Sequence, residues 1–228
     1  MPREFRRNVC LFACAIAGAT VLPSHADSFF DNSTADLRAR FDPGTSEVGD
    51  QIILGSSGFL TNFSFEYWGT ATGPSFAGGA DVQARVRFYR MDGVPFNGYT
   101  TPYSMFFDSD WFGVPGPTDR HTFVFGADDF GPLGLFIPVT ELTWTVQFRG
   151  AAQGDALGVD LYSPPTVGKD YPDYWRKVEG QWVLEENAAG PVDFASRFEG
   201  NPVPEPSTLT FVAVGALGAM FFGRRRNN

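Results

Sequence analysis

The sequence has very few residues of the two types that most often bind transition metals or act as nucleophiles and bases. Of its 228 residues, two are cysteines, Cys10 and Cys14, and two are histidines, His25 and His121. Both cysteines lie in an N-terminal apolar run, so the rest of the chain has no disulfide and no thiol nucleophile. A single remaining histidine excludes a zinc site with several His or Cys ligands. No Gly-x-Ser-x-Gly sequence is present, which argues against a serine hydrolase.

The sequence also lacks a long hydrophobic run, because its two apolar segments are both short and both terminal. The first, residues 9–22, follows three arginines and precedes Ser24-His25-Ala26. A basic start, a short apolar run and small residues at Ser24 and Ala26 are typical of a secretory signal peptide. We therefore expect residues 1–26 to be removed by signal peptidase after export through the inner membrane, although an uncleaved anchor is the alternative.

The C-terminal segment has three parts: Pro204-Glu205-Pro206, an uncharged apolar run, and Arg224, Arg225 and Arg226. The two prolines predict an extended linker over residues 201–208. Residues 209–223 can form a transmembrane helix, although they are fewer than the ~20 residues of a usual span. By the positive-inside rule, residues 224–228 form a basic cytoplasmic tail and the domain lies outside. An ordinary membrane anchor with a proline linker would have the same features.

This three-part pattern resembles the PEP-CTERM sorting signal of exported proteins in Gram-negative bacteria. The matching positions are Pro204, Glu205 and Pro206, the apolar run, and the arginine cluster. The resemblance implies that exosortase, an integral membrane protease or transpeptidase, recognises the tail. It also implies a transient membrane anchor and then release or attachment at the cell surface, often in organisms that make exopolysaccharide.

The chain has few basic residues relative to acidic ones. It carries 17 lysines and arginines against 26 aspartates and glutamates, and removal of both terminal segments leaves 11 against 24. An acidic domain of this kind is not expected to bind nucleic acid or anionic lipid surfaces. Neutral sugars and cations remain compatible with it.

The region between the terminal segments, residues 27–200, has the alternating pattern of β-strands and no amphipathic helical stripe. Apolar and polar residues alternate over 62–67, 82–89 and 142–149. Weaker strands are expected at 51–54, 104–107, 121–125, 157–162, 175–178, 181–185 and 192–198. Glu179-Gly180 predicts a tight hairpin. We expect an all-β domain of two antiparallel sheets, a jelly-roll-like β-sandwich with a phenylalanine-rich core; a closed barrel is the alternative.

Carboxylates provide the only candidates for catalysis or metal binding. Asp108 and Asp110 lie two residues apart and could contribute oxygen ligands to Ca²⁺, but the consensus calcium loop is absent. The Glu-x-Asp-x-x-Glu run of laminarinase-like glycosidases is absent as well. We therefore expect no catalytic residues, no metal and no cofactor, and glycoside hydrolysis is the least favoured alternative.

Aromatic residues suggest a binding role, because neighbouring strand residues point to opposite faces and cannot all be buried. Trp111, Tyr174, Trp175 and Trp182 are the candidates for an exposed platform that stacks on sugar rings. The alternative is that these rings cover the edges of the core. The sequence thus predicts an exported, non-catalytic surface or matrix protein with a structural or interaction role, and the alternative is an exopolysaccharide-binding module.

Overall fold

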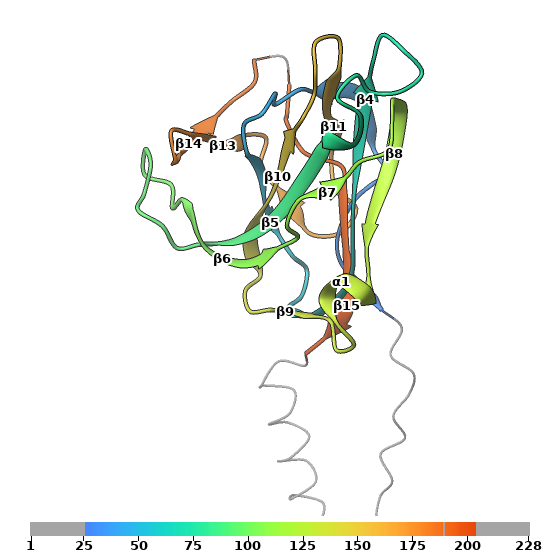
Figure 1. Cartoon of the computed structure of the whole chain (residues 1–228). Coiled ribbons are helices and arrows are strands. Elements are labelled where there is room, and N and C mark those ends of the chain that lie inside the picture. The colour runs from blue at the N-terminus through green and yellow to red at the C-terminus, as the bar shows by residue number, and fades with distance from the viewer. Residues whose placement is uncertain (1–25, 189, 204–228) are drawn as a thin grey trace, which may run out of the picture.

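The computed structural model describes residues 26–188 and 190–203, which form two antiparallel β-sheets packed face to face (Figure 1). This arrangement confirms the predicted all-β fold and is consistent with a β-sandwich. Apart from Ala26, the predicted signal peptide lies outside the described residues, as do the Pro-Glu-Pro motif, the predicted span and the arginine cluster. Within the described ranges, no helix is long and apolar enough to cross a membrane.

The first sheet has seven strands arranged around the long strand β4, with β15 and β11 along one of its edges and β9 and β8 along the other. Beyond these, β1 pairs with β15 and β2 pairs with β11. The strands are β1 (Asp27–Asn32), β2 (Asp36–Phe41), β4 (Gly58–Thr70), β8 (Thr118–Phe125), β9 (Leu135–Ile137), β11 (Ala156–Tyr162) and β15 (Ser196–Pro202).

The second sheet has eight strands in the order β14-β13-β3-β10-β5-β6, with β12 paired to β3 and β7 paired to β5. They are β3 (Val48–Ile53), β5 (Gln83–Met91), β6 (Pro102–Asp108), β7 (Phe112–Gly113), β10 (Glu141–Arg149), β12 (Lys169–Asp170), β13 (Tyr174–Val178) and β14 (Gln181–Glu185). In the part of the chain that the structure describes, the helical elements are the short helix α1 (Ala127–Phe130) and a 3₁₀ turn, Gly79–Asp81.

The strands with the clearest alternation are found where the sequence predicts them, at β4, β5 and β10. The predicted hairpin is also confirmed: Val178 pairs with Gln181, and both turn residues, Glu179 and Gly180, have positive φ. The last strand differs from the prediction. β15 begins at Ser196 rather than at residue 192 and continues through Pro202, so residues 201–202 belong to the sheet and not to the predicted linker.

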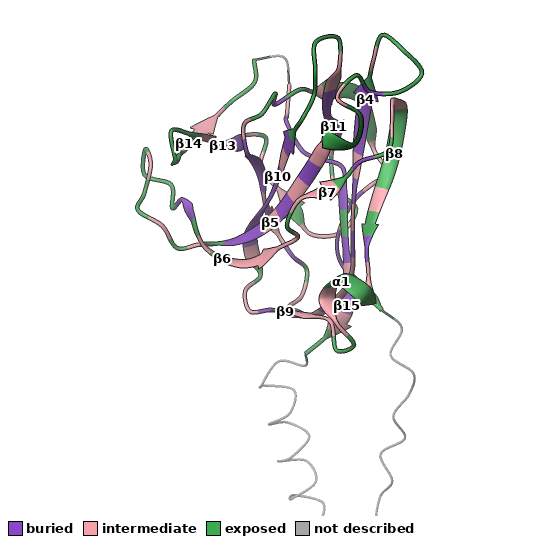
Figure 2. Ribbon diagram, in the orientation of Figure 1, coloured by how far each residue is buried: buried purple, intermediate pink, exposed green. Residues whose placement is uncertain are grey.

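Phenylalanine rings fill the space between the sheets, as the composition predicts. Phe63 of β4 is fully buried, and its ring centroid lies 4.7–5.3 Å from those of Phe198, Phe88 and Trp144. Full burial of each such side chain contributes up to about 3 kcal/mol. In Figure 2 the buried residues, drawn in purple, lie along the central strands of the two sheets, such as β5 and β10. The core therefore holds the sandwich together without a disulfide in this region.

Both ends of the described domain lie at the same end of the sandwich. The first residue of β1, Asp27, pairs with Gly200, and Pro202 pairs with Gly58 at the start of β4. We call this end, which includes the β9 strand and the turn before it, the exit pole (Figure 1). The exit pole is thus the place from which the chain continues into its C-terminal segment.

Candidate functional site

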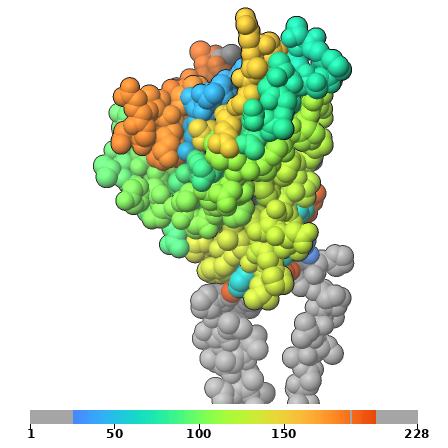
Figure 3. All heavy atoms as spheres, viewed as in Figure 1, coloured from blue at the N-terminus to red at the C-terminus, as the bar shows by residue number. Residues whose placement is uncertain are grey.

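A cleft of about 590 Å³ opens between the β13–β14 hairpin and the segment 92–103. Aromatic residues and prolines make up half of the residues that line it, and Lys177 and Gln181 are among the others. The aromatic members are Tyr89, Phe96, Tyr103 and Trp182. We call this feature the aromatic cleft. In Figure 3 the orange atoms of the hairpin lie above the green atoms of the opposing segment, on the side of the molecule away from the exit pole.

The hairpin register sets the position of Trp182, the largest ring of the aromatic cleft. Trp182 pairs directly with Lys177 across the hairpin, so both side chains project from the same face. The Lys177 ammonium lies 5.0 Å from the indole centroid, and the ring of Tyr89 contacts the indole edge to face at 5.6 Å. These contacts fix the indole in place, and it stays half-buried at the cleft.

The rim of the aromatic cleft is unusually apolar for a solvent-exposed segment. Val94 and Tyr103 line it and are 85% and 72% exposed. Tyr99 and Met105, from the same stretch of chain, are also at least half exposed. An exposed apolar group of this size beside a concave surface is typical of a binding site.

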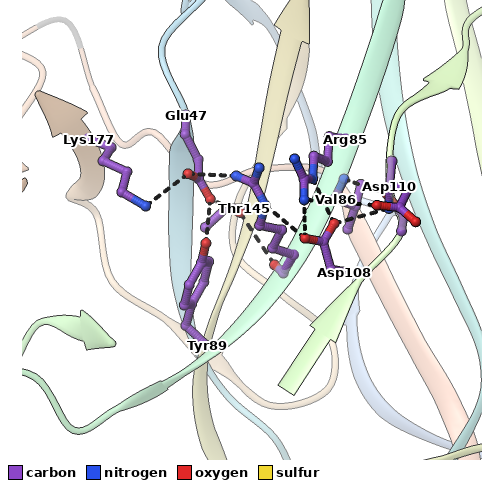
Figure 4. Close-up of polar contacts among 10 residues, drawn as sticks. Glu47, Arg85, Val86, Tyr89, Asp108, Asp110, Thr145 and Lys177 are labelled. Atoms are coloured by element: carbon purple, nitrogen blue, oxygen red, sulfur yellow. Dashed lines mark hydrogen bonds and ion pairs between the residues drawn. The ribbon is translucent and has the colours of Figure 1, made fainter. Parts of the chain in front are cut away.

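Below the aromatic cleft, a charged network holds its floor in place (Figure 4). The Tyr89 hydroxyl donates a hydrogen bond of 2.9 Å to Glu47, which also accepts one from Thr145. Arg87 and Lys177 lie 2.7 and 3.3 Å from the other carboxylate oxygen. Burial opposes ionisation of Glu47, but the charges of Lys177 and Arg87 outweigh it and hold the pKa of this carboxyl below its ordinary value.

Asp108 and Asp110, which the sequence offered only as weak calcium candidates, lie beside the arginines of this network. Asp108 accepts a 2.7 Å hydrogen bond from Arg85 and lies 3.4 Å from Arg87. The Asp110 side chain is 94% exposed. Asp108 is thus already paired with two cations, an arrangement that does not favour calcium binding by the two acids. Among residues 26–188 and 190–203, no group of three or more His, Cys, Asp or Glu side chains is arranged to hold a metal.

The predicted four-residue platform is wrong for two of its members. Trp175 is fully buried and donates a 3.0 Å hydrogen bond to Gln51, and Tyr174 is 5% exposed and belongs to the core. No exposed platform forms at these two residues because both faces of the second sheet are covered there. Gly49 of β3 allows this close packing on the outer face, because a Cβ on it would lie 2.5 Å from the Thr143 methyl group.

The other two candidates lie in different places. Trp182 is in the aromatic cleft. Trp111 follows β6 and is half-buried, with the Arg149 guanidinium 4.1 Å from its ring centroid. It is not among the residues that line the cleft, so the two tryptophans do not form one platform.

Several residues of the aromatic cleft were not singled out in the sequence, among them Tyr89, Phe96, Tyr103 and Lys177. The segment 94–103 contains three aromatic residues and two prolines right after the Asp92-Gly93 turn, and this density was an available signal. The sequence could not predict that this segment folds back toward the β13–β14 hairpin, which lies some 80 residues later in the chain.

A second group of buried carboxylates lies on the inward face of β3 and beside it. Asp50 is fully buried between the core residues Val48 and Ile52, and it accepts a 2.9 Å hydrogen bond from the backbone of Phe194. Burial and the neighbouring charges of Asp193 and Asp170 raise the pKa of Asp50 well above its ordinary value. Burial also raises the pKa of Asp193 to about 7 and that of Asp170 to about 6.

The decisive observation about sorting concerns the C-terminal segment. A family model for the PEP-CTERM protein-sorting motif matches residues 202–226. These residues are a PEP-CTERM sorting motif. The match confirms the resemblance and is consistent with an exosortase substrate. The motif implies export and sorting to the cell surface. No curated protein and no solved structure matches this chain.

Proposed function

We propose that this chain is an exported surface or matrix protein whose β-sandwich is non-catalytic and has a structural or interaction role. The sorting motif at residues 202–226 is the observation that carries the export and surface part of the proposal. In this proposal, signal peptidase removes residues 1–26, and residues 209–223 anchor the protein in the membrane until exosortase processes the tail. The folded domain then stays at the cell surface or in the matrix.

The chemistry of the aromatic cleft supports a non-catalytic role. No Asp or Glu is among the residues that line it. Glu47, the nearest buried acid, lies below the cleft and is neutralised by Arg87 and Lys177. Glycoside hydrolysis needs two carboxyl groups about 5–9 Å apart across the substrate. That arrangement is not found in this cleft.

Carbohydrate binding is the second candidate function, and the aromatic cleft favours it. Sugar rings present one apolar face and many hydroxyls, so they match a site that combines flat aromatic rings with a few polar groups. Trp182 and Tyr103 provide the rings, and Gln181 and Lys177 provide hydrogen-bond donors. We propose exopolysaccharide as the ligand class.

Co-sedimentation with the exopolysaccharide of the producing organism tests this candidate. We expect the protein to bind and Trp182→Ala to lower the affinity by at least about tenfold, as for the loss of a central aromatic anchor. Trp111→Ala is the matched control, because it removes an equally large, half-buried ring outside the cleft. Wild-type protein that stays in the supernatant would rule carbohydrate binding out, and equal losses in both variants would place the site elsewhere.

The sorting proposal has its own test. Mass spectrometry of the mature protein from an exosortase-positive cell should find no peptide that carries Arg224, Arg225 and Arg226. The same cell without exosortase should retain that peptide. An intact C-terminus on surface protein from the exosortase-positive cell would contradict the proposed processing.

A further inference from the structure

The exit pole carries a second group of exposed apolar side chains, separate from the aromatic cleft. Leu133 is 78% exposed, Phe136 is 50% exposed, and Val203, where the described chain ends, is 44% exposed. The half-buried Phe59 extends this group, since its ring centroid lies 5.2 Å from that of Phe136. In Figure 3 the yellow-green atoms of this part of the chain lie at the lower end of the coloured domain.

The strand register brings these side chains next to the strand that leads to the sorting motif. Phe136 of β9 pairs with Phe59 of β4, and Phe59 pairs on its other edge with Asn201 of β15. Since neighbouring strands are about 4.8 Å apart, Phe136 lies roughly 10 Å from β15. Gly134 fixes the preceding turn, because its φ is 79° and a Cβ there would lie 2.5 Å from the backbone oxygen of Leu60.

The chain beyond Val203 is short. Six peptide units connect Val203 to Leu209, where the apolar run of the sorting motif begins. At about 3.6 Å per residue, they span at most roughly 20 Å. A domain whose tail is held in a bilayer would therefore keep its exit pole within that distance of the lipid, with Leu133 and Phe136 on the near side.

The charges at the exit pole indicate which lipid it suits. Asp128 and Asp129 of α1 are exposed and directly precede the turn that carries Leu133. Anionic lipid would repel them, whereas neutral phospholipid would not. Two apolar side chains bury too little area to hold a soluble domain on a membrane alone, so the contact depends on the tether.

We propose that, while the tail is in place, the exit pole rests on the membrane with Leu133 and Phe136 among neutral phospholipid headgroups. This inference rests on the proposed anchoring by residues 209–223. It sets the orientation of the anchored protein: the exit pole faces the lipid and the aromatic cleft faces away from it. Removal of the tail then ends the lipid contact as well as the anchor.

Fluorescence quenching in phosphatidylcholine vesicles tests the lipid contact with the membrane-extracted protein. An environment-sensitive fluorophore is attached at Leu133→Cys or Phe136→Cys, which is the single cysteine once residues 1–26 have been removed. Val94→Cys is the matched control, because Val94 is as exposed as Leu133 but lies at the aromatic cleft. We expect a blue shift and quenching by spin-labelled lipid at positions 133 and 136, and neither at position 94.

Flotation of the same vesicles separates this inference from the anchoring on which it rests. Protein that floats with the vesicles while positions 133 and 136 stay unquenched overturns the lipid contact and leaves the anchoring intact. Equal quenching at 94 and 133 also overturns it, because the domain would then have no fixed orientation. Protein that does not float contradicts the anchoring, and the lipid contact with it.

Discussion

Two buried carboxylates three residues apart, Glu47 and Asp50, respond to burial in opposite ways. Glu47 lies on the outward face of the second sheet, where Arg87 and Lys177 compensate its charge and its pKa is lowered. Asp50 lies on the inward face, where its charged neighbours are acids and its pKa is raised. Burial disfavours the charged form of both, so the partners decide the outcome. The comparison shows that the charge of Glu47, below the aromatic cleft, is stabilised by its partners, whereas ionisation of Asp50, in the core, lowers the stability of the fold.

The largest expected effect comes from removal of the cation that supports Glu47. Arg87→Met leaves Glu47 with Lys177 alone and takes one of two arginines from Asp108. A buried charge that loses its partner typically costs about 3–5 kcal/mol of the free energy of unfolding. Urea denaturation measures the loss. Arg90→Met is the matched control, since Arg90 is exposed on the same strand and should cost little. Equal stability of the two variants would contradict the role of Arg87.

The pH dependence of stability should reflect the second group of carboxylates. The pKa of Asp193 is raised from 3.8 to about 7, so the folded protein binds this proton more tightly than the unfolded chain does. The stabilisation that protonated Asp193 contributes is therefore complete below about pH 3.8 and is lost as the pH rises through 7. One such group can account for a loss of up to about 4 kcal/mol of the free energy of unfolding. Urea denaturation between pH 5 and pH 8 should show this loss, and Asp193→Asn should reduce it. An unchanged slope in the variant would rule Asp193 out as its source.

Glu47 should act in the opposite direction. Its folded pKa lies below its ordinary value, so its contribution is present above pH 4.5 and is lost as the pH falls through the folded value. Glu47→Gln should therefore destabilise the protein at pH 7 and have a smaller effect in acid. A variant that loses the same free energy at pH 7 and pH 3 would show that packing, not charge, is responsible.

A smaller effect is expected when Asp50 becomes neutral. Asp50→Asn keeps an oxygen that can accept the Phe194 hydrogen bond and removes the charge that burial and Asp193 oppose. We expect a gain of about 1–2 kcal/mol at pH 8 and a smaller gain at pH 4, because the raised pKa of Asp50 makes the cost of its charge grow with pH. Thermal denaturation at both pH values measures the difference. A loss at pH 8 would mean that the Asp50 charge has a partner.

The smallest effect should come from the floor of the aromatic cleft. Tyr89→Phe removes one hydrogen bond to Glu47 and keeps the ring that contacts Trp182. The expected cost is about 1 kcal/mol of stability, and the proposed sugar binding by the cleft should be largely retained. Tyr89→Ala, which also removes the ring, should weaken both. Equal binding by the two variants would contradict a role for the Tyr89 ring in positioning Trp182.

The sequence predicts the sheets well because strand alternation is local. The alternation over 62–67 and 142–149 reports which side chains face inward, and both segments are strands. Short or irregular strands such as β9 and β12 have no such signal, since two or three residues cannot show a period. β1 and β2 were not predicted either. β2 is exposed on both faces, so apolar and polar residues do not alternate along it.

The candidate site was harder to predict because it depends on which faces are covered. Alternation correctly places Tyr174 and Trp175 on opposite faces, but it does not reveal that both faces are buried. Asp108 of β6 pairs with Arg85 and Arg87 of β5. Because these residues are on different strands, their spacing in the sequence does not predict the ion pairs. Only the sorting motif could be read directly, because its order and spacing are themselves linear.

The pairing of β1 with β15 has a consequence for the timing of folding. These strands are the first and last of the described domain, and their residues are about 170 positions apart in the chain. Contacts between such distant segments close late, because a long loop must be ordered first. In a chain exported from its N-terminus, β1 would have to wait for β15 to emerge before the first sheet could be completed. The step that completes the fold would thus bring the newly exported end of the chain, and the sorting motif that follows it, to the exit pole.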